Sequence, residues 1–138
     1  MNRTYLIDTN VLLRHILADH PELCKRAKIL MDKVCNGDIK AQIIEGVIVE
    51  CVYVLLKVYE VPREKIANVL INILEYRGIK DKNKSVYISA LMNFANNNID
   101  IVDNILAAFS NDENVVASFD KDFNRLEAET WNLESEKG

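Results

Sequence analysis

The chain has 138 residues, of which 49% are hydrophobic and 28% are charged, and it contains only four glycines and two prolines. This length and composition predict one globular domain over residues 1–138 and exclude a disordered or fibrous protein. Seventeen basic and 21 acidic residues give a net charge of −4, so charge alone does not attract a polyanion. Two local clusters remain candidates for nucleic-acid contact: Lys25, Arg26 and Lys28, and Lys80, Lys82 and Lys84.

No apolar stretch reaches the roughly 18 residues that a membrane helix needs. The longest one, Val47–Leu56, is interrupted by Glu50, and the N-terminus has no signal-peptide core. We therefore expect a cytoplasmic protein that does not enter the membrane. The cysteines are odd in number and lack a C-x-x-C spacing, so we expect reduced, buried thiols. They are Cys24, Cys35 and Cys51.

Short β-favouring runs and longer runs with helical spacing alternate along the chain. Strands are predicted at 5–7, 41–44 and 115–118, with edge strands at 79–83 and 130–133 and a loop at 119–123. Helices are predicted at 11–17, 21–36, 45–59, 63–77, 84–96 and 100–109. This alternation predicts an α/β fold, in which one parallel sheet of four to five strands is flanked by helices on both faces. An acidic C-terminal tail is expected at about 127–138.

Two aspartates follow predicted strands directly, where α/β proteins bind ligands. Asp8 ends the first strand and Asp120 follows the strand at 115–118. Because parallel strands end at the same edge of a sheet, we expect these two carboxylates to meet. Each also has a simpler interpretation, since Asp8 could cap the next helix and Asp120 could be a polar turn residue.

Two further acids lie on predicted helices. Glu50 is surrounded in sequence by apolar residues, and a buried carboxylate is costly unless it is paired or bound to a metal. A solvent-facing edge shared with Lys57 is the alternative. Asp100 and Asp103 open the helix at 100–109 with the spacing of a capping box, which leaves Asp103 free to point outward if Asp100 is the cap. The helix dipole alone could also account for both aspartates.

Clustered carboxylates raise one another's pKa values and cost stability unless a cation neutralises them. Mg²⁺ and Mn²⁺ prefer oxygen ligands, and such an ion can polarise a phosphate and activate water for in-line attack. The two histidines lack partners for a zinc site, and no phosphate-binding glycine motif or nucleophile-elbow motif is present. The acids therefore predict a hard divalent metal site that cleaves phosphodiester bonds.

Four stretches in this order resemble the PIN-domain family and, within it, the VapC-type toxin ribonucleases. The resemblance spans residues 5 to about 126, and its stretches are Asp8–Arg14, Val49–Leu55, Asp100–Ala108 and Ser118–Phe123. It implies a parallel sheet flanked by helices and a pocket of three or four acids that holds Mg²⁺ or Mn²⁺. It also implies a ribonuclease directed at single strands, a homodimer, and a small antitoxin partner.

The resemblance assigns a role to individual positions of this chain. Asn104 departs from the family by replacing the small residue usual after the third acid, and Ser118 stands where Thr is common. The residues that match supporting polar positions are Thr9, Asn10 and Ser118. The residues that match metal-binding, catalytic acids are Asp8, Glu50, Asp103 and the more variable Asp120, with Asp100 and Asp122 as additional candidate ligands.

These features predict a metal-dependent endoribonuclease that cleaves single-stranded RNA as the toxin of a type II toxin–antitoxin pair. The alternatives are a PIN ribonuclease that processes or surveys RNA without an antitoxin, and a non-catalytic metal- or RNA-binding module. A phosphoacceptor domain fits less well, because the first strand ends in a single Asp. The helices at 45–59 and 84–96 favour a homodimer, unless their apolar faces are simply core. The residues concerned are Tyr53, Val54, Tyr87, Met92 and Phe94.

Overall fold

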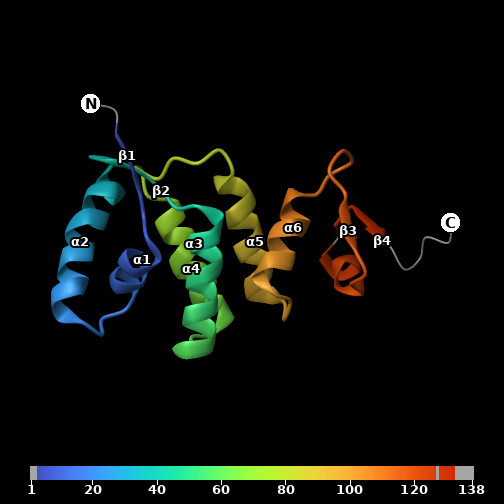
Figure 1. The fold of residues 1–138 in the computed structure, drawn as a ribbon, viewed down its shortest axis with the longest axis horizontal. Coiled ribbons are helices and arrows are strands. Elements are labelled where there is room, and N and C mark those ends of the chain that lie inside the picture. Colours follow the sequence, from blue (N-terminus) through green and yellow to red (C-terminus); the bar gives the residue numbers. More distant parts are fainter. Residues whose placement is uncertain (1–2, 127, 133–138) are drawn as a thin grey trace.

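The chain alternates short strands with longer helices, and the computed structural model describes residues 3–126 and 128–132 (Figure 1). The strands are β1 (Thr4–Leu6), β2 (Lys40–Gln42), β3 (Val116–Ser118) and β4 (Thr130–Asn132). The α-helices are α1 (Thr9–Ile16), α2 (Pro21–Asn36), α3 (Glu45–Tyr53), α4 (Arg63–Leu74), α5 (Lys84–Asn96) and α6 (Ile101–Phe109). A π-helical turn η1 (Val54–Val58) extends α3, and a 3₁₀-helix η2 (Lys121–Leu126) follows β3.

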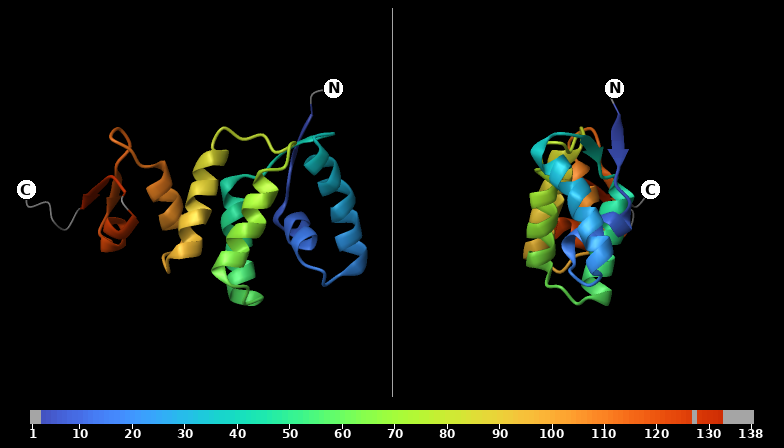
Figure 2. Two further views of the ribbon diagram at one scale, coloured as in Figure 1. Left: turned by 180° about the vertical axis from the view of Figure 1, so that it is seen from behind. Right: turned by 90° about the vertical axis from the view of Figure 1, so that its left-hand side faces the viewer.

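The strands form two separate parallel pairs instead of the single sheet of four to five strands that we predicted. In the first pair Thr4 of β1 lies opposite Lys40 of β2, and in the second Val116 of β3 lies opposite Thr130 of β4. The prediction of parallel strands is therefore confirmed, but that of one continuous sheet is not. The two pairs lie toward opposite ends of an elongated molecule, with α3, α5 and α6 between them (Figures 1 and 2).

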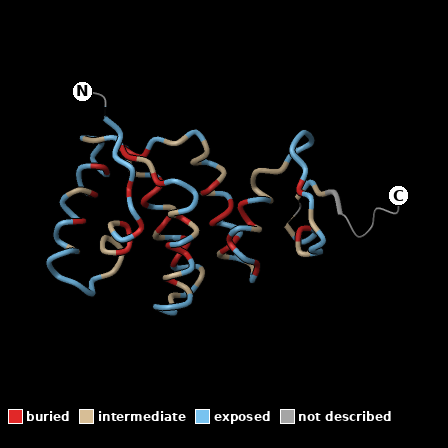
Figure 3. The backbone as a smooth tube through the Cα atoms, in the orientation of Figure 1, coloured by how far each residue is buried: buried red, intermediate tan, exposed pale blue. Residues whose placement is uncertain are grey.

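The hydrophobic core lies between the helices, and buried positions line their inward faces (Figure 3). Consecutive helices α4, α5 and α6 pack side by side, while α1 packs on both α2 and α3. In contrast, all three residues of β1 are exposed. The largest fully buried side chains include Leu12, Met31, Ile48, Leu70 and Phe94.

Local signals account for most helix boundaries. Pro21 occupies the first turn of α2, and Gly37 ends that helix with a φ of 82°, a backbone conformation that glycine adopts without strain. The helix predicted at 45–59 is confirmed over 45–58, and its hydrogen bonding changes from α-helical to π-helical at Val54. Pro62 caps the start of α4, where its missing N–H is no loss.

Two predicted edge strands are realised only in part. The segment 79–83 contributes a single parallel bridge between Ile79 and Ala41 of β2. The segment 130–133 forms β4 at Thr130–Asn132, whereas Leu133 and the rest of the predicted tail, 133–138, lie outside the described residues. The predicted loop at 119–123 gives way to η2 from Lys121 onward.

The expectation of three buried cysteines holds for one of them. Cys51 is buried in the core, and this burial raises the pKa of its thiol to about 12. Cys24 is half-buried, and Cys35 is exposed on α2. Two of the apolar residues that favoured a dimer, Tyr87 and Phe94, are buried within the chain's own core. Those two residues therefore give no argument for an interface.

Within the described ranges, no helix combines the length and the apolar character needed to cross a membrane.

Candidate functional site

Asp8 lies where β1 passes into α1. The backbone N–H of Ile7 donates to the carbonyl of Gln42 at 3.0 Å, which fixes the end of β1 beside β2. The side chain of Asp8 then caps α1 by accepting the N–H of Thr9 at Oδ1, 2.9 Å away. Thr9 itself is buried, whereas Asp8 is exposed. The capping role that the sequence allowed is confirmed, and this bond occupies one of the two carboxylate oxygens.

Glu50 lies on the outward face of α3. The helix directs Ile48, Cys51 and Val52 into the core, and Glu50 is exposed. The argument that apolar surroundings bury this carboxylate was therefore wrong, and the solvent-facing alternative is correct. The reason is that α3 needs only one apolar stripe, and the exposed Tyr53 shares the side of Glu50, one turn further along.

Tyr53 joins α3 to the start of α6. Its hydroxyl donates to the carboxylate of Asp100, at 2.9 Å from Oδ1 and 3.1 Å from Oδ2. Desolvation raises the pKa of Tyr53, and the hydrogen bond and negative charge of Asp100 raise it further, so the phenol stays protonated. Asp100 also accepts the N–H of Val102 at 2.8 Å, which confirms its predicted role as the cap of α6.

Asn104, which the sequence marked only as a departure from the family, holds the turn before α6. Its side chain is completely buried, and its amide donates to the carbonyls of Ile99 and Asp100 at 3.1 Å each. Its oxygen accepts the amide of Asn97 at 2.9 Å. Asn104 is the one polar residue among the buried positions of α6, and this isolated position was the sequence signal for its structural role.

Arg63 of α4 supports the same turn from the other side. Its Nε donates to the carbonyl of Phe94 at 3.0 Å, and its guanidinium lies 3.7 Å from the centre of the Phe94 ring. A further donor, Nη2, bonds to the carbonyl of Ile99. Sequence reasoning missed Arg63, because nothing in its neighbourhood along the chain indicates a partner 31 or more residues away. Together Arg63 and Asn104 fix the backbone from which the acids of α6 project.

Asp103 stands one turn into α6, half-buried, beside acids from the end of β3. Desolvation raises its pKa, and the negative charges of Asp100, Asp120 and Asp122 raise it further. We call Asp103 and the three acids that act on it the acidic cluster. The carboxyl end of β3 is held by Ser118, whose Oγ accepts the N–H of Asp120 at 2.8 Å.

Asp8 and Glu50 are not among the charges that act on Asp103, although both belong to the described part of the chain. Within residues 3–126 and 128–132, no three His, Cys, Asp or Glu side chains are close enough to hold one metal ion. The donor chemistry of the four predicted acids suits a hard cation. Their arrangement within a single chain does not suit one cation. Asp120 follows β3, which lies toward one end of the molecule, and Asp8 follows β1, which lies toward the other (Figure 1).

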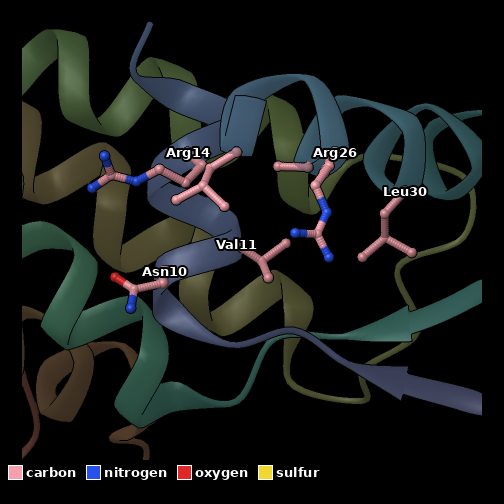
Figure 4. A pocket seen from close by; sticks show the side chains of 7 residues that line it. Asn10, Val11, Arg14, Arg26 and Leu30 are labelled. Atoms are coloured by element: carbon pink, nitrogen blue, oxygen red, sulfur yellow. The ribbon is translucent and has the colours of Figure 1, made fainter. Parts of the chain in front are cut away.

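A groove between α1 and α2 begins beside this end of β1. It encloses about 340 Å³, and its floor includes Val11 and Leu30. The guanidinium of Arg26 extends into it from α2, whereas that of Arg14 turns away (Figure 4). Arg14 instead pairs with Asp19 at 2.7 Å. The groove is therefore apolar with one cationic group reaching into it.

The chain belongs to the PIN-domain family, since the family model for the PIN domain matches residues 5–129. A comparison with curated proteins found no match. PIN domains are generally nucleases that use divalent metals, so the family indicates a phosphodiester hydrolase that binds nucleic acid. The matched range includes β2, β3 and all four predicted acids, and it ends just before β4 begins.

Replacing Asn104 with Ala should destabilise the protein by about 2 kcal/mol, because the carbonyls of buried Ile99 and of Asp100 each lose a donor and the amide of Asn97 loses its acceptor. The measurement is the free energy of unfolding in urea. Asn68→Ala, at an exposed position of α4, is the control and should change it by less than about 0.5 kcal/mol. Equal effects of the two substitutions would contradict the role assigned to Asn104.

Replacing Asp103 with Asn should raise the melting temperature at pH 7. The raised pKa of Asp103 means that the folded state holds this proton more tightly than the unfolded chain does. The wild type therefore loses stability as pH rises from the usual aspartate range through that raised pKa, and the Asn variant does not. The advantage of the variant should vanish below about pH 4. Asp112→Asn in the exposed loop is the control, and a pH-independent difference for Asp103→Asn would refute the assignment.

Proposed function

We propose that the chain is a divalent-metal-dependent endoribonuclease that cleaves single-stranded RNA, with Asp8, Glu50, Asp103 and Asp120 as its catalytic acids. The observation that carries the proposal is the acidic cluster where α6 begins and β3 ends. A carboxylate whose pKa is raised by burial and by neighbouring acids, as that of Asp103 is, costs stability when ionised, and such perturbed groups concentrate at functional sites. Membership of a nuclease family supports the same conclusion.

The neighbours of these acids have positioning roles in the proposal. Tyr53 and the cap of α6 occupy the carboxylate of Asp100, which leaves Asp103 as the acid available to a ligand. Ser118 holds the turn that carries Asp120, and Thr9 fixes the carboxylate of Asp8 through its N–H. Asn10 is exposed on the first turn of α1 and lines the groove, and we assign it a contact with the substrate.

Mg²⁺ or Mn²⁺ is the cofactor in this proposal. Four carboxylates with no zinc-type nitrogen or sulfur ligands among them form a donor set for a hard cation. Such a cation would also offset the charge of the acids, which otherwise repel a phosphodiester. We assign Asp122 an additional role as a supporting acid, because Arg125 pairs with it at 3.5 Å and its charge acts on Asp103.

The toxin role is a further part of the proposal. The groove between α1 and α2 fits an amphipathic peptide with apolar side chains for Val11 and Leu30 and a carboxylate for Arg26. An antitoxin segment of that chemistry would cover Asn10 and lie beside Asp8, so it would block the site directly. An RNA-processing enzyme without an antitoxin has no need of an apolar groove at this place.

Single replacements of Asp8 and Asp103 by Asn should each lower Mn²⁺-dependent cleavage of a single-stranded RNA by about 100-fold or more. Chelation with EDTA should stop the wild-type reaction, and Mn²⁺ should restore it. Glu113→Gln, in the exposed loop before β3, is the matched control and should cleave normally. Undiminished cleavage by both aspartate variants would reject the proposed site.

The antitoxin proposal has its own test. Expression of the chain alone should arrest bacterial growth, and co-expression with the small protein encoded by an adjacent reading frame should restore it. Replacing Arg26 with Glu should weaken that rescue by reversing the charge in the groove, while Lys33→Glu outside the groove should leave it intact. Cleavage without growth arrest would instead favour an RNA-processing enzyme.

A further inference from the structure

A polar pocket lies between the end of α5 and η2, apart from the groove between α1 and α2. It encloses about 270 Å³, which is just under the roughly 300 Å³ at which pockets for drug-sized ligands begin. The pocket therefore suits one small polar group. Its lining consists of three asparagines, one arginine and one leucine, which are Asn93, Asn96, Asn97, Arg125 and Leu126.

Two of the asparagines present exposed amides at the end of α5. Asn93 and Asn96 are three residues apart, so they lie on the same face of the helix. Asn96 donates one amide hydrogen to the carbonyl of Met92 at 3.0 Å and keeps its oxygen as an acceptor. Asparagine is a poor residue inside a helix, because its side chain competes with the backbone for hydrogen bonds. Helix formation therefore does not explain an exposed Asn93 within α5.

The third asparagine, Asn97, makes one wall of the pocket rigid. Its oxygen accepts the N–H of Ile99 at 3.0 Å, and its amide donates to the buried Asn104 at 2.9 Å. Asn97 thus belongs to the network that fixes the turn before α6. The amides of Asn93 and Asn96 are the ones that a ligand can use.

Arg125 contributes the charged group of the pocket. One of its guanidinium nitrogens donates to the oxygen of Asn98 at 3.0 Å, and another pairs with Asp122 at 3.5 Å. A guanidinium carries five N–H donors in a planar fork, so donors remain for a ligand. Because Asp122 offsets the positive charge, the pocket favours a neutral group with hydrogen-bond acceptors over a phosphate.

The pocket adjoins the acidic cluster. Asp122, the partner of Arg125, is a member of that cluster, and Asn98 precedes Asp100 by two residues in the turn before α6. A nucleotide whose base lies in the pocket would therefore hold a neighbouring phosphodiester close to the acids.

We propose that this pocket binds a guanine base of single-stranded RNA and thereby selects the bond that is cleaved. Unpaired bases present their edges to side chains. Guanine offers O6 and N7 as adjacent acceptors for the fork of Arg125, whereas adenine and cytosine carry an amino group on the corresponding edge. The amide oxygens of Asn93 and Asn96 suit the N–H groups of guanine. The selection of a bond rests on the proposed nuclease function, but the binding of the base does not.

The first test measures binding without cleavage. Labelled RNA octamers of uridine, with one central residue left unchanged or replaced by guanosine, adenosine or cytidine, are titrated with the protein by fluorescence anisotropy. EDTA and low ionic strength prevent metal-dependent cleavage and favour binding. The guanosine octamer should bind about 10-fold more tightly than the other three.

Two variants assign this preference to the pocket. Asn93→Ala and Arg125→Lys should each lower it by about threefold or more, the latter because lysine keeps the charge but lacks the planar fork. Asn124→Ala, at an exposed position of η2 that does not line the pocket, is the control and should keep the preference. Equal binding of the four octamers, or a preference that Asn93→Ala leaves unchanged, would overturn the proposal.

The second test asks whether the pocket directs cleavage. With Mn²⁺, the ratio of kcat/KM for the guanosine octamer to that for the uridine octamer should be about 10, and Asn93→Ala should lower this ratio while Asn124→Ala keeps it. Equal cleavage of both octamers by the wild type would overturn the selection of a bond but not the nuclease function. A wild type that cleaves neither octamer would reject the nuclease and leave the binding test valid.

Discussion

Repulsion of the half-buried Asp103 carboxylate by neighbouring acids governs the candidate site. Desolvation raises the pKa of Asp103, the negative charges of Asp100, Asp120 and Asp122 raise it further, and the chain compensates for only part of this charge. Tyr53 and the N-terminus of α6 stabilise Asp100, and Arg125 pairs with Asp122. Asp103 has no comparable partner among the described contacts. Its ionised form is therefore available to a bound cation, which explains how a feature that costs stability can serve a nuclease.

The polar network beneath the cluster keeps it in place. Asn104 and Arg63 bond to the same carbonyl, that of Ile99, from opposite sides, and thereby fix the turn between α5 and α6. Because this network is buried, losing one member leaves other polar groups without partners. The turn is thus rigid, whereas the acids that project from it remain accessible. The same logic applies at β1, where Thr9 is buried and the adjoining Asp8 is exposed.

Local patterns allowed much of the fold to be predicted. Pro21 and Gly37 fix the ends of α2, and the spacing of Asp100 and Asp103 identified the cap of α6. Pairing between distant strands could not be predicted from the sequence, because three-residue strands carry little register information. Nothing local shows whether β3 pairs with β1. Glu50 was misjudged for a related reason: a helix rich in apolar residues still has one face that its neighbours leave uncovered. The contribution of Asn104 depends on contacts that only the tertiary structure reveals.

The central claim is that Asp8, Glu50, Asp103 and Asp120 bind one divalent cation together. A crystal structure of the protein grown with Mn²⁺, with the ions located by their anomalous scattering, tests this claim most directly. We expect Mn²⁺ bound by Asp8, Glu50, Asp103 and Asp120. No Mn²⁺ at any of the four acids, or Mn²⁺ found only elsewhere on the protein, would contradict it.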